Sequence, residues 1–182
     1  DDGRAYMVFA YAKSRSGIKH RLSLVEMDPQ CRCLLAEPGL IFDGEQIAPT
    51  SEGPKMYKKN GYYYLFASTG TCCEGLKSTY QTVVGRSSSL WGPYLDKQGR
   101  SMLDNNHVVL IHNNKSFVGT GHNAELITDK ADNDWILYHG VSVSNPYGRV
   151  LLLDRVDWKK GWPVVEGDTP SLQAKAPVIR HK

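Results

Sequence analysis

The 182-residue sequence lacks a long apolar run and a strong excess of either charge. No segment approaches the roughly 20 consecutive apolar residues that a membrane-spanning helix needs, so we expect no membrane span. The formal net charge is +3, and lysine and arginine are scattered along the chain, so nucleic acid is not an expected partner. A hydrophobic fraction of 41% and a charged fraction of 23% are typical of a globular domain with its own core.

Cysteine is scarce, and its spacing excludes the common structural metal sites. The four cysteines are Cys31, Cys33, Cys72 and Cys73, which form one C-x-C pair and one adjacent pair. Neither pair has the C-x-x-C spacing of a structural zinc site. This spacing disfavours zinc binding. Adjacent cysteines can form only a strained disulfide, so redox catalysis is disfavoured as well.

Helical periodicity is also missing. No segment longer than about ten residues carries an apolar stripe with a period of 3.6. Short aromatic or β-branched runs follow turn residues such as Asn60-Gly61 instead. We expect strands at residues 6–9, 20–27, 62–66, 81–86, 135–138 and 148–156. The chain is therefore predicted to be all-β.

The order of these runs is a repeat. A turn, an aromatic strand, a loop, an apolar strand and a closing turn recur three times, and the closing turns at residues 27–29, 91–94 and 158–163 resemble one another. Repeats of this kind are typical of propeller blades. A β-sandwich is the alternative, but it does not predict recurring closing turns. Trp91, Trp158 and Trp162 fall in these turns, where we expect them to pack between blades.

One acid occupies an unusual place in this pattern. Glu52 lies in the run Ser51-Glu52-Gly53-Pro54, shortly before the aromatic strand at residues 62–66. This position places the carboxylate at the mouth of a strand. It is either a catalytic acid or a surface acid that precedes a turn.

Six motifs in one order carry a resemblance to a known family. They are Glu52-Gly53-Pro54; Cys72-Cys73-Glu74-Gly75 with Ser78-Thr79-Tyr80; Val84-Gly85-Arg86-Ser87; Gly92-Pro93-Tyr94; Gly119-Thr120-Gly121-His122-Asn123; and residues 148–154 with Gly161-Trp162-Pro163. This order resembles the C-terminal portion of the arabinanases of glycoside hydrolase family 43. The resemblance implies a five-bladed β-propeller, of which residues 1–182 supply roughly the last three blades and part of another. The N-terminal blades of the catalytic domain are then missing from this chain.

The resemblance also implies a mechanism. Enzymes of that family hydrolyse with inversion, one carboxylic acid protonating the leaving oxygen and one carboxylate activating water. Glu52 matches the general acid, which must keep its proton near neutral pH in an apolar or like-charged setting. The base and a third carboxylate find no matching motif here, and we assign neither role to Asp1, Asp2 or Asp43. We therefore expect an N-terminal fragment of the same propeller to supply both groups, and this chain alone to be inactive.

Other site residues follow from the same resemblance. His122 matches a histidine that binds a cation at the propeller centre, calcium or sodium, otherwise surrounded by water. A lone histidine is more often a hydrogen-bonded core residue. Cys73, Ser78 and Arg149 match positions near the sugar, with packing or an exposed strand-edge charge as the alternatives.

The implied function is hydrolysis of α-1,5-linked L-arabinan or arabino-oligosaccharides, with endo and exo action both open. A related arabinofuranosidase or xylosidase, or a non-catalytic carbohydrate-binding propeller, remains the alternative. A polymeric substrate is too large to enter a cell, which predicts a secreted or cell-surface protein.

Overall fold

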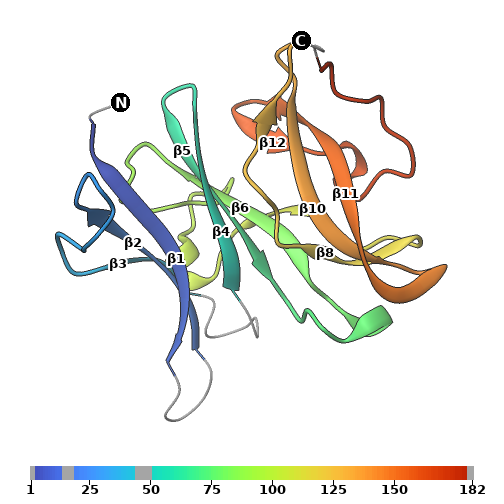
Figure 1. Ribbon diagram of the computed structural model, residues 1–182, viewed down its shortest axis with the longest axis horizontal. Coiled ribbons are helices and arrows are strands. Elements are labelled where there is room, and N and C mark those ends of the chain that lie inside the picture. Colours follow the sequence, from blue (N-terminus) through green and yellow to red (C-terminus); the bar gives the residue numbers. More distant parts are fainter. Residues whose placement is uncertain (1–2, 14–18, 44–50, 180–182) are drawn as a thin grey trace.

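Antiparallel strands form nearly all of the regular structure in the computed structural model, which describes residues 3–13, 19–43 and 51–179 (Figure 1). The helices of this part of the chain are the three short 3-10 turns η1 (Gly75–Lys77), η2 (Met102–Asp104) and η3 (Glu166–Asp168). None of the helices described is long or apolar enough to cross a membrane. The prediction of an all-β chain is confirmed.

The first group of strands is a three-stranded antiparallel sheet. It consists of β1 (Ala5–Lys13), β2 (Lys19–Met27) and β3 (Gly39–Asp43), in that spatial order. It contains the predicted strands at residues 6–9 and 20–27. The acids Asp1 and Asp2 lie outside the described residues.

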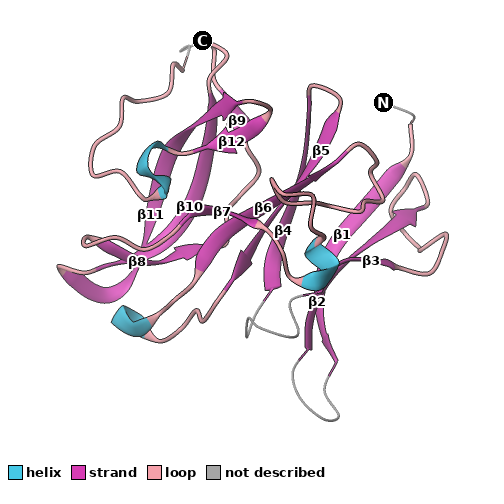
Figure 2. Cartoon of the chain, turned by 180° about the vertical axis from the view of Figure 1, so that it is seen from behind, coloured by secondary structure: helices cyan, strands magenta, loops and turns pink. Residues whose placement is uncertain are grey.

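The second group begins with the hairpin of β4 (Ser51–Lys59) and β5 (Tyr62–Thr69). Asn60 and Gly61 turn this hairpin with φ angles of 51° and 80°, as the two-residue turn predicts. β6 (Gln81–Ser87) pairs with β5, and β7 (Val108–Ile111) pairs with β6 (Figure 2).

The third group is built around the long hairpin of β10 (Asp134–Ser142) and β11 (Asn145–Lys159). On one side of it, β8 (Phe117–Gly121) and the short β9 (Ile127–Thr128) pair with β10. On the other side, β12 (Trp162–Val164) pairs with β11. A single parallel bridge from β8 to β6 joins the third group to the second.

The three groups lie side by side as successive blades (Figure 1). Each contains one of the hairpins β1–β2, β5–β6 and β10–β11, followed by one of the predicted closing turns. The expected packing of Trp158 is also found, because its ring stacks on Tyr57 and contacts the edge of Tyr64 from the neighbouring group. The repeat read from the sequence is therefore a repeat in space.

The core lies between the groups rather than inside any one of them. One buried cluster joins the first group to the second and includes Leu22, Phe42 and Leu65. A second cluster joins the second group to the third and includes Phe66, Ile136 and Tyr138. Since each sheet buries its faces against its neighbours, removing one group uncovers a face of the next.

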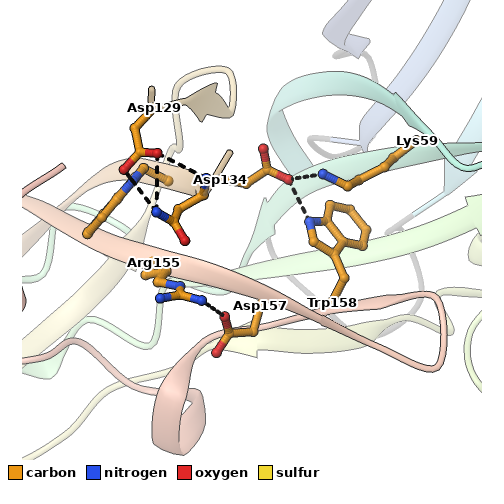
Figure 3. A network of polar contacts seen from close by, with 8 residues as sticks. Lys59, Asp129, Asp134, Arg155, Asp157 and Trp158 are labelled. Atoms are coloured by element: carbon orange, nitrogen blue, oxygen red, sulfur yellow. Dashed lines mark hydrogen bonds and ion pairs between the residues drawn. The ribbon is translucent and has the colours of Figure 1, made fainter. Parts of the chain in front are cut away.

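A buried carboxylate strengthens the contact between the second and third groups (Figure 3). Asp134, at the start of β10, has a side chain only 1% exposed and accepts hydrogen bonds from Lys59 Nζ at 2.5 Å and Trp158 Nε1 at 2.6 Å. Tyr57 and Thr128 donate two more. Burial opposes its ionisation, but these donors, with Lys59 foremost, hold the pKa of Asp134 below its usual value.

Candidate functional site

Glu52 lies at the start of β4, where an irregularity interrupts the ladder with β5. It pairs with Ser68, whereas Lys55 already pairs with Phe66, so Gly53 and Pro54 form a bulge. Gly53 has a φ of 60°, and a Cβ atom there would lie 3.2 Å from the ring of His122. Glycine therefore permits the close approach of β4 to His122. The prediction of an acid at a strand mouth matches this position.

Tyr80 binds the carboxylate of Glu52. Its hydroxyl donates a hydrogen bond of 2.7 Å to Glu52 Oε1, and the tyrosine is only 1% exposed. Gly121 makes room for the ring, since a Cβ atom there would come within 2.4 Å of it. Burial, and then the hydrogen bond to Glu52, raise the pKa of Tyr80 far above its usual value. Tyr80 is therefore a hydrogen-bond donor at any working pH.

His122 completes a cluster of three with Glu52 and Tyr80. Its Nδ1 lies 3.4 Å from the Tyr80 hydroxyl and 4.0 Å from Glu52 Oε1. The backbone has a φ of 53°, and its N–H donates to Ser68 Oγ at 2.7 Å. The side chain is 53% exposed, so the ring is accessible rather than packed in a core.

His139 on β10 lies beside this cluster. Its ring stacks on Tyr80 at 5.9 Å between centroids, and on His122 at 6.1 Å. Burial, followed by the nearby charges of Arg149 and His122, lowers the pKa of His139 to about 4. The imidazole is therefore neutral near pH 7. Its position was not predicted from the sequence, because the register that pairs His139 with Gly121 and Leu151 is a tertiary property.

A cavity of about 180 Å³ collects the three predicted substrate-binding residues, because Cys73, Ser78 and Arg149 all line it. His139 and Tyr147 contribute to the same wall. Arg149 Nη2 donates to Cys73 Sγ at 3.2 Å, and its Nη1 lies 3.4 Å from His139 Nε2. The sequence motifs therefore converge on one concave surface next to the Glu52 cluster.

Hydrogen bonds within the loop already occupy the hydroxyl of Ser78. It donates to the carbonyl of Cys72 and accepts from the N–H of Glu74, both at 3.1 Å, and the residue is only 4% exposed. Ser78 thus shapes the loop that carries Cys73. Cys72 and Cys73 are free thiols, and the hydrogen bond between them, together with burial, raises the pKa of Cys72.

The described residues contain no group of three histidine, cysteine or acidic side chains that could hold a metal ion. They offer the accessible imidazole of His122 beside the carboxylate of Glu52. These donors fit a cation that takes most of its ligands from water, as the family resemblance implies. They do not fit a closed site made by protein ligands alone.

The sequence model for glycosyl hydrolases family 43 matches residues 1–163. The chain belongs to this family. It is 39% identical over 132 residues to the extracellular exo-α-(1→5)-L-arabinofuranosidase ArbA of Cellvibrio japonicus, which covers 71% of this chain and 38% of that protein. It is 37% identical over 112 residues to the extracellular endo-α-(1→5)-L-arabinanase 1 of Bacillus subtilis, covering 62% of this chain and 33% of that protein.

The fold agrees with the family assignment. The chain superimposes on a Cellvibrio cellulosa α-L-arabinanase in complex with arabinohexaose with a TM-score of 0.73 and 31% identity, covering 88% of this chain and 57% of that one. Such family 43 arabinanases are five-bladed propellers, so the described residues form part of a propeller, as predicted. The chain spans little more than a third of the length of the two relatives.

Proposed function

We propose that this family 43 protein hydrolyses α-1,5-linked L-arabinan or arabino-oligosaccharides with inversion, and that Glu52 is its general acid. The main support is the hydrogen bond from buried Tyr80 to Glu52 Oε1, which fixes a carboxyl group beside the cavity lined by Cys73, Ser78 and Arg149. Two relatives whose names specify α-(1→5)-L-arabinose linkages support arabinan as the substrate class.

In this mechanism Tyr80 sets which oxygen of Glu52 carries the proton. Because the phenol donates to Oε1, that oxygen is an acceptor, and the proton resides on Oε2. From Oε2 it passes to the glycosidic oxygen as the bond to the leaving sugar breaks. A second carboxylate, on the opposite side of the sugar, takes a proton from the attacking water. In inverting enzymes this carboxylate and the acid are about 6.5–9.5 Å apart, which leaves room for the water.

That base, and a third carboxylate, are proposed to come from the remaining blades of the propeller. The described residues place no second carboxylate within hydrogen-bonding distance of Glu52. The partner in this proposal is an N-terminal fragment of the same propeller, in the same or a separate polypeptide. The substrate is then held between that fragment and the cavity beside Glu52.

His122 is the proposed ligand of a central calcium or sodium ion, with water as its other ligands. When bound, such an ion supplies positive charge that orients carboxylates and sugar hydroxyls. The residue itself holds its ring next to Glu52 through the backbone hydrogen bond to Ser68. Arg149 is proposed to donate to sugar hydroxyls, with Cys73 forming the adjacent wall. We also propose that the protein is secreted or lies at the cell surface, as the names of the extracellular relatives suggest.

The decisive experiment replaces Glu52 with glutamine in the full-length protein and measures release of reducing ends from linear arabinan. Loss of the acid should lower kcat by about 10²–10⁴-fold. Glu166→Gln, at an exposed position on η3 that does not line the cavity, is the control and should retain full activity. Chromatography of the products separates endo from exo cleavage.

Two results would contradict the proposal. Normal activity in Glu52→Gln would exclude this residue as the acid. A wild-type protein that binds arabinohexaose without cleaving it would favour the non-catalytic carbohydrate-binding alternative.

A further inference from the structure

A second cavity, of about 460 Å³, lies where the second group of strands meets the third. Its walls come from the start of β5, the end of β6, the closing turn and loop that follow β6, and β12. Sites for small molecules have volumes of roughly 300–1,000 Å³. We use the term edge pocket for this cavity, which is bounded by Tyr62, Arg86, Ser88, Pro93, Lys97 and Trp162.

The edge pocket is separate from the candidate site. Tyr62 begins β5, whereas Ser68, which pairs with Glu52, lies near the end of the same strand. Six residues of extended chain span about 20 Å. Figure 1 shows the turn before β5 at the top of the second group and the loop after β5 at the bottom. No described residue lines both cavities, so a ligand in the edge pocket leaves the cavity beside Glu52 open.

Arg86 is held in a fixed position in the edge pocket. Its guanidinium carbon lies 4.5 Å from the ring centroid of Tyr62 and 4.5 Å from that of Trp162. Its Nη1 donates to the carbonyl of Gly161 at 2.9 Å, and a Cβ atom on Gly161 would approach this nitrogen to 2.8 Å. These contacts fix the plane of a group that has five N–H donors. Donors therefore remain for a ligand, and they are already oriented.

The edge pocket also carries positive charge that no nearby acid balances. Among the described residues, no carboxylate forms an ion pair with Arg86 or Lys97. Asp96 belongs to the lining, but its side chain is 0% exposed and pairs with Arg100 Nη2 at 2.7 Å. It also accepts the N–H of Gln98 at 2.8 Å. The charge of Asp96 is therefore satisfied within its own loop, and the pocket favours an anion.

The rest of the lining fits a ligand larger than an inorganic anion. Tyr62 is 37% exposed and, with Pro93, supplies apolar surface to the pocket. Ser88 is exposed and supplies a hydroxyl group, which can donate and accept hydrogen bonds. Apolar surface beside a few placed polar groups is the usual composition of a small-molecule site. A sugar ring has both an apolar C–H surface and hydroxyl groups, and so matches this wall.

We infer that the edge pocket binds an acidic sugar unit of an anionic polysaccharide, with Arg86 and Lys97 on its carboxylate. The planar fork of an arginine matches a carboxylate through two parallel hydrogen bonds, and a lysine adds a point charge. A neutral polymer such as arabinan lacks the group that Arg86 recognises. Binding at this pocket holds the protein on an acidic polymer while the cavity beside Glu52 stays free. The inference goes beyond the proposed function and does not rest on it.

Isothermal titration calorimetry of the full-length protein with a trimer of galacturonic acid tests this inference. The wild type should bind the trimer, and added salt should weaken the binding. Lys97→Glu should weaken it by about 5-fold or more, because an attraction is removed and a repulsion is added. Lys115→Glu is the matched control, since it makes the same change of net charge at an exposed lysine outside the edge pocket. Its affinity for the trimer should stay close to that of the wild type.

Arg86→Gln tests the guanidinium itself. It removes the charge and the fork, so binding should weaken by about 10–100-fold. The melting temperature shows whether this variant folds, and if it does not, the two lysine variants still decide the question.

Four results would overturn the inference. They are a wild type that does not bind the trimer, equal affinity for neutral arabinotriose, binding of sulfate without binding of the trimer, and equal losses in Lys97→Glu and Lys115→Glu. Glu52→Gln should bind the trimer as the wild type does. Failure of the proposed function therefore leaves this result unchanged.

Discussion

Tyr80 and Glu52 are 28 positions apart in the sequence, yet the buried phenol donates directly to the carboxylate at 2.7 Å. The bond joins the beginning of β4 to the residue just before β6. A buried donor of this kind restricts the carboxyl group to one orientation, which is what proton transfer in a fixed direction requires.

Replacing Tyr80 with phenylalanine should therefore weaken catalysis without removing the acid. The lost hydrogen bond to a charged group corresponds to a decrease of about 10–100-fold in kcat. Without the phenol the carboxyl group can turn away from the direction in which it transfers its proton, so the decrease should appear in kcat rather than in KM. Kinetics on a soluble arabino-oligosaccharide measure both constants.

Tyr138→Phe is the matched control for this experiment. Tyr138 is also 1% exposed, and its hydroxyl donates to the carboxylate of Asp154 at 2.6 Å, away from the cavity. Both substitutions remove a buried phenol hydroxyl, so both should lower the melting temperature. Only Tyr80→Phe should lower kcat. If the two variants have the same kcat, Tyr80 serves packing alone.

The sequence predicts the hairpins well because their determinants are local. The aromatic run from Tyr62 to Phe66 and the Asn60-Gly61 turn specify β5, and the closing turns reveal the repeat. The strands β3, β4, β7, β8, β9 and β12 were not among the expected strands. All of them except β4 have only two to five residues each, and they become strands by pairing with neighbouring strands. The bulge at Gly53 and Pro54 interrupts the nine-residue β4.

The candidate site was predictable only in part. Motifs located Glu52, His122 and Arg149, since each lies in a short run with an unusual glycine or proline. The hydrogen bond from Tyr80 and the stacking of His139 could not be predicted from the sequence, because they depend on where β4, β6, β8 and β10 meet. Local patterns specify backbone conformation, whereas these contacts are set by packing between blades.

His122 yields a prediction about the central cation. Treating the full-length protein with a chelator should lower its activity, and added calcium should restore it, because the ion supplies positive charge near Glu52. In His122→Ala the rate without chelator should be about 10-fold or more lower than that of the wild type, because the contact between the imidazole and the ion is lost. The chelator should then have no further effect. Elemental analysis of both proteins measures the bound ion.

The control for this prediction is His112→Ala. His112 is an exposed histidine whose Nδ1 contacts the carbonyl of Asn113, outside the cavity. It should retain activity and its response to the chelator. A wild-type protein that contains no cation and works normally in chelator would contradict the role proposed for His122.

Arg149 yields a prediction about substrate binding. Arg149→Ala removes donors from the wall of the cavity, so kcat/KM for arabino-oligosaccharides should fall by about 10–100-fold. Arg155→Ala is the control on the same strand, because Arg155 pairs with exposed Asp157 at 3.0 Å outside the cavity. The pKa of His139 should also rise in Arg149→Ala, since a nearby positive charge is removed. An unchanged kcat/KM would show that Arg149 does not contact the sugar.

Asp134 yields a prediction about stability at low pH, and Figure 3 shows both the test residue and its control. Its folded-state pKa lies below the unfolded value of about 3.9, so its stabilising effect is present above that pH and is lost as the pH falls through the folded-state value. Asp134→Asn should cost about 3–5 kcal/mol at pH 7, because Lys59 loses its buried partner. The stability of this variant should also vary less with pH below pH 4 than that of the wild type.

Asp157→Asn is the control, because it removes an exposed ion pair and should cost at most about 1 kcal/mol. Urea unfolding at several pH values measures both variants, and equal losses in the two would show that the buried network does not hold the blades together.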